Sequence, residues 1–194
     1  MHATRIVTFL LGGWIFCTLA VDAAAYLNLQ LPERVMANPP PQARKLFTDY
    51  GPQEMALLLR HFAAEGNRYF FGRWELTEIL LGVVLIPLVF LATDRKPVPA
   101  LLAGFMLLIA LFQYFALTPE LAYRGREADF PPGRGNFRTE ERVWLLDEVY
   151  IGMEAALVLV GGVLTFYVAS YKSRRRLRAG EDPALLEEIT RRRD

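Results

Sequence analysis

The side chains of this chain that could do chemistry are acids within or beside long apolar stretches. Together with one nearby tyrosine they are Asp22, Glu75, Glu78, Asp147, Tyr150 and Glu154. A carboxylate inside a bilayer is costly, so acids at such positions need a structural or functional reason. Three reasons remain open: binding of a hard cation, transfer of protons, or ion pairs with loop arginines. The last needs no activity, and its candidate partners are Arg68, Arg73, Arg124 and Arg142.

Helical spacing predicts that these acids share one pocket. Glu75 and Glu78 fall on one face of a helix, and Asp147, Tyr150 and Glu154 form a stripe on another. Polar faces turn inward in membrane bundles. We therefore expect a candidate polar pocket in the outer half of the membrane domain.

Residue counting gives each acid a depth. Asp22 lies about 8 Å and Glu154 about 15 Å from the outer face, at the helical rise of 1.5 Å per residue. These two are the stronger functional candidates. We expect the other acids to be shallow enough for hydration: Glu75, Glu78, Asp147 and Glu148.

Four apolar stretches must position these residues: 6–27, 74–92, 98–117 and 149–171. A bilayer core of about 30 Å needs about 20 apolar residues in a helix. Hydrophobic residues make up 53% of the chain. We expect an all-α four-transmembrane-helix bundle over residues 1–171, whose short link at 93–97 makes the second and third helices antiparallel neighbours.

The two outer loops, 28–73 and 118–148, have structure of their own. Three prolines at 39–41 break the first loop, and helical periodicity then predicts an amphipathic helix over residues 52–71. Its apolar residues, expected to face the bundle or the lipid interface, are Met55, Leu58, Leu59 and Phe62. In the second loop, Thr139 is expected to cap the last helix and Trp144 to lie at the membrane interface.

Basic residues predict the orientation. Arg95 and Lys96 stand in the short link, and the tail at 172–194 has eight Lys or Arg against five acids. The positive-inside rule then gives a multi-pass protein of the cytoplasmic (inner) membrane with both termini cytoplasmic. The basic tail could contact anionic lipid, and a membrane protein partner or a second copy is possible. The net charge of +1 argues against nucleic-acid binding.

The first apolar stretch has a second interpretation. Arg5, an apolar run and three alanines at 23–25 also occur in secretory signals. The run is long for a signal, however, and it contains Trp14 and the pair Gly12-Gly13, which are typical of a packed helix. We expect a retained span.

Several enzyme classes lack the residues they need. The chain has only two histidines, His2 and His61, and one cysteine, Cys17, so haem ligation, di-iron sites and Cys/His catalysis are not supported. His61, one turn before Glu65, could bind a metal, but a lone loop histidine is more often a surface residue. We expect no enzyme, no catalytic residues and no cofactor.

Short motifs resemble a known family. The motifs are Asn67-Arg68-Tyr69-Phe70-Phe71 with Trp74-Glu75, and Leu117-Thr118-Pro119-Glu120. With Phe130, residues 138–144 and residues 150–154, they resemble the four-span integral membrane family of unknown function related to transmembrane protein 205. This resemblance implies a small integral membrane protein without established catalytic activity, and it transfers no binding residues. The sequence thus favours an accessory or structural membrane protein, with a small ion- or proton-binding or transport protein as the alternative.

Overall fold

Every element that the structure describes is helical. The computed structural model describes residues 2–130 and 137–181. The elements are α1 (His2–Ala37), α2 (Pro41–Tyr50), α3 (Pro52–Ala92), α4 (Pro97–Phe112), the π-helix η1 (Gln113–Leu117), α5 (Thr118–Asp129) and α6 (Phe137–Glu181). Four stretches of helix, with α4, η1 and α5 counted as one, are long and apolar enough to cross a membrane. The expected all-α four-helix bundle is confirmed.

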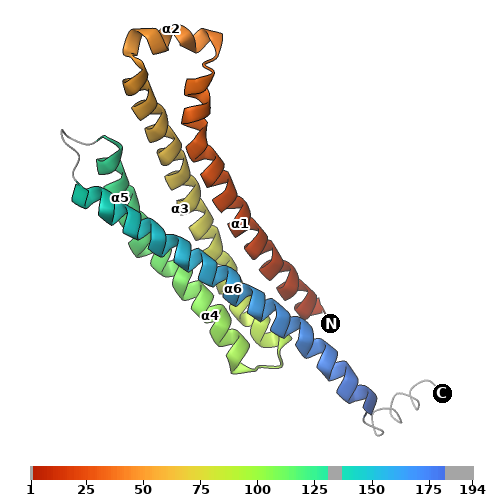
Figure 1. The fold of residues 1–194 in the computed structure, drawn as a ribbon. Helices are drawn as coiled ribbons and strands as arrows, with labels where there is room; N and C mark the ends of the chain where they lie inside the picture. The colour runs from red at the N-terminus through yellow and green to blue at the C-terminus, as the bar shows by residue number, and fades with distance from the viewer. Residues whose placement is uncertain (1, 131–136, 182–194) are drawn as a thin grey trace.

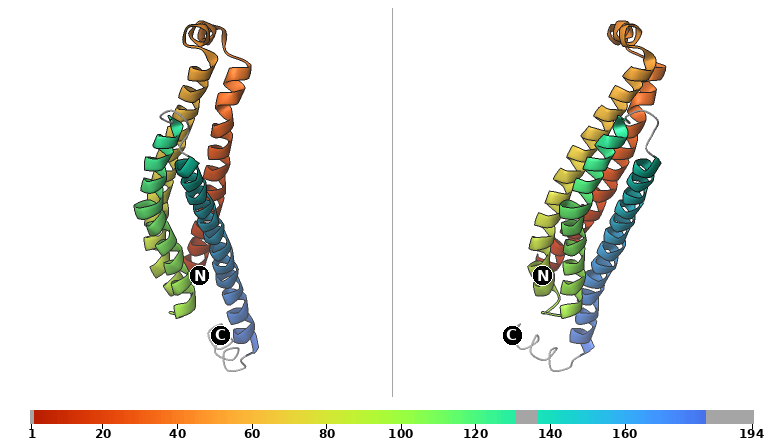
Figure 2. Two further views of the ribbon diagram at one scale, coloured as in Figure 1. Left: turned by 60° about the vertical axis from the view of Figure 1, so that its left-hand side comes forward. Right: turned by 90° about the vertical axis from the view of Figure 1, so that its left-hand side faces the viewer.

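The four long helices form a closed ring of contacts, with α1 against α3, α3 against α4, α4 against α6 and α6 against α1. The N-terminus, the α3–α4 turn and the end of α6 lie at one end of the bundle (Figure 1). At the other end, here called the α2 end, α1 and α3 extend past α5 and the start of α6, and α2 bridges their tips (Figure 2).

The exposed surface of the bundle is apolar. Phe9, Leu108 and Phe166 are 79%, 64% and 74% exposed, although they are large apolar side chains. A water-soluble protein rarely exposes contiguous patches of this kind. Their placement around the outside of the bundle is that of side chains facing lipid.

Helix α3 differs from the sequence expectation. The amphipathic helix expected at 52–71 and the span expected at 74–92 form one continuous helix of 41 residues. That length is about 60 Å, twice the hydrocarbon core of about 30 Å, so much of α3 projects beyond the membrane. The chain has no proline between Pro52 and Pro87, and Gly66 and Gly72 alone do not break the helix.

Two residues of the expected apolar face, Leu58 and Phe62, do not pack against the bundle, which leaves the lipid interface as their expected surroundings. Leu58 and Phe62 are 41% and 63% exposed, whereas Ala63 and Asn67 are buried. The side-chain amide of Asn67 donates to the Ala25 carbonyl at 3.0 Å, which holds α3 against α1. Small and amide residues therefore make the contact here, and the larger apolar side chains cover the outside.

Two glycines allow close helix approach, as the small-residue rule for membrane bundles predicts. A Cβ on Gly82 would lie 2.9 Å from Leu107 Cδ1, and one on Gly161 would lie 3.2 Å from Met106 Cε. The pair Gly12-Gly13 has nothing within 4 Å of the added carbons. Those two glycines do not pack, contrary to expectation.

The link between α3 and α4 is a tight turn, as expected. Asp94 and Arg95 adopt positive φ values of 50° and 63°, and the Arg95 N–H donates to the Phe90 carbonyl at 2.8 Å. The Tyr171 hydroxyl donates to Asp94 Oδ2 at 3.0 Å, and the Lys96 ammonium lies 4.7 Å from the centre of the Tyr171 ring. The turn is thereby fastened to α6.

Helix α6 is longer than expected at both ends. It begins at Phe137, so Thr139 lies inside the helix and is not its N-cap. Trp144, the expected interfacial anchor, is 63% exposed. The helix continues to Glu181, and the rest of the basic tail, 182–194, lies outside the described residues.

Candidate functional site

Three glutamates are buried in the middle of the bundle. Glu75 and Glu78 are 0% exposed and Glu154 is 4% exposed. The first two stand one turn apart on α3, and Glu154 comes from α6. Glu78 interacts electrostatically with both Glu75 and Glu154, so the three form one cluster, here called the carboxyl cluster.

Helix α1 supplies the donors to Glu78. The Trp14 indole N–H donates to Glu78 Oε1 at 2.7 Å, and the Thr18 hydroxyl donates to the same oxygen at 3.1 Å. Trp14 and Thr18 stand one turn apart on α1 and are 2% and 1% exposed. Two donors on one oxygen fix the Glu78 side chain, and its other oxygen, Oε2, meets no donor within hydrogen-bond distance among the described residues.

The π-helix and the first residue of α5 supply donors to the other two carboxyls. Gln113 Nε2 donates to Glu154 Oε1 at 2.9 Å, and the Thr118 hydroxyl donates to Glu75 Oε1. Pro119 has no backbone N–H to donate, and its ring crowds the preceding turn of the helix. Both effects explain the local change to the wider turns of a π-helix. That change brings both Gln113 and Thr118 to the inner face.

Six buried polar atoms of this region have no hydrogen-bond partner among the described residues. They are Oε2 of Glu75, Glu78 and Glu154, with Gln113 Oε1, the Tyr150 hydroxyl and Trp74 Nε1. Nearly all buried polar atoms in proteins are paired, so a group of six unpaired ones needs an explanation. Protons, water or a bound ion could satisfy them.

Ion pairing does not explain the carboxyl cluster. The arginines named as possible partners are engaged or exposed elsewhere: Arg68 pairs with Glu65 and Asp129, Arg124 pairs with Glu120, Arg73 covers the Tyr69 ring and Arg142 is exposed. No ion pair among the described side chains involves a buried glutamate. The hypothesis that these acids form ion pairs with loop arginines is wrong for this cluster.

The structure brings four of the six predicted residues together. Glu75, Glu78, Tyr150 and Glu154 meet in the core, where Tyr150 interacts electrostatically with all three carboxyls. Asp22 is half-buried on α1 and is an electrostatic neighbour of Glu154. The sixth residue, Asp147, lines the adjoining pocket that is described below.

The expectation that Glu75 and Glu78 are hydrated was wrong. Glu75 and Glu78 are fully buried, whereas Asp22, expected among the deepest, is only half-buried. The error arose because α3 was expected to begin near Glu75. In the continuous helix both glutamates lie mid-helix, enclosed by α1, η1 and α6.

Sequence reasoning missed the donors. Trp14 was taken as a packing residue, and Thr18, Gln113 and Thr118 were not identified as partners of the acids. Gln113 was the available signal, since an amide in an apolar stretch of a membrane helix usually bonds a neighbouring helix. Pro119, six residues before Gly125, was a further sign of an irregular helix.

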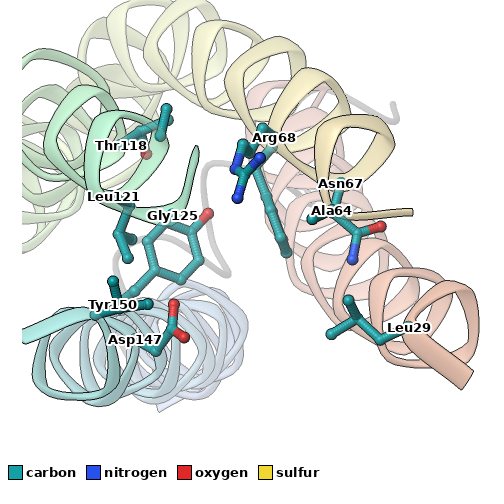
Figure 3. A pocket seen from close by; sticks show the side chains of 12 residues that line it. Leu29, Ala64, Asn67, Arg68, Thr118, Leu121, Gly125, Asp147 and Tyr150 are labelled. Atoms are coloured by element: carbon teal, nitrogen blue, oxygen red, sulfur yellow. The ribbon is translucent and has the colours of Figure 1, made fainter. Parts of the chain in front are cut away.

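A pocket of about 190 Å³ adjoins the cluster on its α2 side. Arg68, Asp147, Tyr150 and Thr118 are among its lining side chains, and the first three point into the same space (Figure 3). Thr118 and Tyr150 also belong to the surroundings of the carboxyl cluster. Toward the termini, the buried core is apolar, with Leu11, Leu85, Val89, Met106 and Leu164. The carboxyl cluster therefore has a pocket on its α2 side and an apolar core toward the termini.

A second titratable cluster lies near the α2 end. His61, Glu65 and Asp129 place ligand atoms within 4.8 Å of one another, the one such group of three among the described residues. Arg68 Nη1 donates to Glu65 and Asp129 at 2.8 Å each, and Arg126 Nε donates to Glu65 at 2.6 Å. His61 Nδ1 lies 2.9 Å from Asp129 Oδ2.

This second cluster is a closed ion-pair network. Glu65 lies on the part of α3 that projects beyond the span, and the hydrogen bond and charge of Arg126, with those of Arg68, lower its pKa to about 2. Two arginines balance two carboxylates, so the network needs no metal ion. The carboxyl cluster, which has no cationic partner, is the better candidate for a functional site.

Comparison with known proteins does not assign the chain to a family. No family model, no curated protein and no solved structure matches the chain. The resemblance to the family related to transmembrane protein 205 therefore stays a prediction. The function must be argued from the geometry of the site.

Proposed function

We propose that this integral membrane protein binds protons at Glu75, Glu78 and Glu154. One observation carries the proposal: each of these buried carboxyls has one paired oxygen and one oxygen without a partner. An uncompensated carboxylate in apolar surroundings is costly. Because no cationic side chain among the described residues compensates the charge, each carboxyl needs a proton or a bound cation.

The geometry favours protons over a shared metal ion. Oxygen ligands of one cation must converge on a single point at 2.0–2.6 Å. The carboxylate oxygens of the three glutamates do not all come within 4.8 Å of one another, whereas those of a metal site would. A protonated carboxyl can instead donate its O–H to a nearby acceptor, such as Gln113 Oε1 or the Tyr150 hydroxyl.

The surroundings of the cluster favour exchange with one side. Thr118 and Tyr150 line the pocket and also neighbour Glu75, and the opposite part of the core is apolar. This arrangement supports proton uptake and release at one membrane face better than conduction through the bundle. From the basic residues near the termini, we propose that the pocket faces outward from the cytoplasmic membrane, with anionic lipid as a partner of the tail.

The accessory role that the sequence favoured accounts for less of the geometry. A purely structural contact would be complete with the hydrogen bonds from Trp14, Thr18, Gln113 and Thr118. It gives no reason for three further carboxyl oxygens to be buried without partners. The proposal includes no catalytic step, in keeping with the expectation that the protein is not an enzyme.

Infrared spectroscopy of the purified protein in neutral detergent tests the proposal. Protonated carboxyls absorb separately from carboxylates, and their band moves on exchange into deuterium oxide. We expect such a band at neutral pH, and we expect Glu78→Gln and Glu154→Gln each to weaken it. Glu148→Gln, an exposed acid on α6, is the matched control and should leave the band unchanged.

Two results would overturn the proposal. A wild-type spectrum without a protonated-carboxyl band at neutral pH would show that the glutamates are ionised. A melting temperature that rises with an added divalent cation, and no longer does so in Glu154→Gln, would make the cluster a metal site. Mass action makes the second result easy to detect, at about 2.7 kcal/mol for a hundredfold excess over Kd.

A further inference from the structure

The pocket beside the carboxyl cluster has room for a small organic molecule. Its volume is about 190 Å³, and it lies between α1, α3, α5 and α6 (Figure 3). A cavity of about 150 Å³ holds benzene in another protein. A ligand somewhat larger than one benzene ring therefore fits this space.

The charge left free in the pocket is negative. Arg68 is the one cationic side chain in the lining, and its Nη1 is committed to Glu65 and Asp129. Asp147 also lines the pocket and makes no hydrogen bond or ion pair with a described residue. Asp147 and Arg68 interact only through their electrostatic field. A positively charged ligand is thus the one that the pocket attracts.

The position of Arg68 is built into the fold. A Cβ on Gly125 would lie 2.5 Å from Arg68 Nη2, so only glycine allows the guanidinium to lie against α5 there. Arg68 is held at the wall by this contact and by its two carboxylates. It is not free to turn and pair with Asp147.

The remaining walls suit an organic cation. Two aromatic rings, Phe71 and Tyr150, meet with their centres 5.2 Å apart and their planes at 60°. Aromatic faces attract ammonium groups that have shed their water. Tyr150 is 7% exposed, so its ring is largely shielded from water. The other walls are mainly apolar, which is unfavourable for a hydrated metal ion.

We propose that this pocket binds a small organic ammonium ion, with its nitrogen between Asp147 and the aromatic rings and its apolar part against Leu121 and Val143. The inference goes beyond proton binding and does not depend on it, because Asp147 is not part of the carboxyl cluster. The carboxylate of Asp147, which has no ion-pair partner among the described residues, would repel an anion. A neutral ligand would leave that charge without a partner.

Binding of benzyltrimethylammonium to the full-length protein in a neutral maltoside detergent tests the proposal. Calorimetry against empty micelles should show saturable binding, and neutral benzyl alcohol and anionic benzenesulfonate should bind at least tenfold more weakly. Asp147→Asn should weaken binding of the cation at least tenfold. Glu148→Gln, which changes the neighbouring acid outside the pocket lining, should bind as the wild type does.

A second variant keeps the test decisive if Asp147→Asn fails to fold. Ala122→Phe should fill the pocket from α5 and abolish binding while leaving the charges in place. Equal binding of the three probes, wild-type affinity in either variant, or no binding beyond partition into micelles would each overturn the inference. The Glu154→Gln protein should still bind the cation, which separates this result from the proton-binding test.

Discussion

The indole N–H of Trp14 donates to Oε1 of Glu78 at 2.7 Å, although 64 residues separate the two in sequence. This bond joins α1 to α3 in the middle of the bundle, where both residues are buried. The first helix is thus part of the candidate site as well as part of the bundle.

Trp14→Phe should destabilise the protein by about 1–3 kcal/mol, because it leaves a buried acceptor with one donor fewer. Part of the loss will come from the smaller ring. The measurement is the melting temperature in detergent, followed by intrinsic fluorescence. Trp144→Phe is the matched control, because Trp144 is 63% exposed, and it should change the melting temperature little.

A double-mutant cycle separates the hydrogen bond from packing. In a Glu78→Leu background, Trp14→Phe should cost less than in the wild type, with a coupling of about 0.5–3 kcal/mol. An equal cost in both backgrounds would mean that Trp14 acts only through its volume.

Gly125→Ala and Gly104→Ala should change stability in opposite directions. At Gly125 the new methyl group would meet Arg68 Nη2, so the guanidinium must move away and weaken its ion pairs. Gly104 on α4 has nothing within 4 Å, and a helical Gly→Ala change there should stabilise by about 0.5–1 kcal/mol. Thermal unfolding of the two variants, compared with the wild type, gives the signs. Stabilisation by both changes would show that Arg68 does not depend on its place against α5.

The ion-pair network should lose its contribution in acid. The pKa of Glu65 is about 2 in the folded protein, against an ordinary value of 4.5. Because the unfolded chain takes up this proton at higher pH, the stabilisation is complete above about pH 4.5 and fades as the pH falls toward 2. The melting temperature of Glu65→Gln should therefore lie below that of the wild type at pH 7, and the difference should shrink steadily on acidification.

Glu127→Gln serves as the control for the pH experiment. Glu127 is an exposed acid on α5, the helix that also carries Arg126. Its replacement should give a difference that varies little with pH. If the Glu65→Gln difference were constant from pH 7 to pH 3, the two arginines would not be holding the carboxylate.

The sequence predicted the fold class because the physical signal was strong. Apolar stretches of about 20 residues leave few structures other than membrane-spanning helices. The length of α3 was missed because Arg68, Arg73 and Glu75 resemble a boundary in the hydropathy pattern. A helix does not end where its surroundings change from membrane to water, and nothing in residues 66–76 terminates it.

The carboxyl cluster was predictable in part for a similar reason. Helical spacing placed Glu75 with Glu78, and Tyr150 with Glu154, which follows from periodicity alone. Their common location in the core depends on which helices are neighbours, and spacing within a helix says nothing about that. The donors Gln113 and Thr118 also depend on a local π-helix, whose register an α-helical wheel cannot give.

Cysteine labelling tests the orientation that we propose. The α3–α4 turn and α2 lie at opposite ends of the bundle (Figure 1). In a Cys17→Ser background, we expect Lys45→Cys on α2 to react with a membrane-impermeant maleimide in intact cells. We expect Arg95→Cys in the turn to react only after the membrane is opened, because basic residues near the termini favour the cytoplasmic side. Both positions are exposed, so access depends on the membrane and not on burial.

Labelling of position 95 in intact cells, with position 45 protected, would reverse the orientation and turn the pocket toward the cytoplasm. Labelling of both positions from one side would contradict the hairpin of α3 and α4 across the membrane.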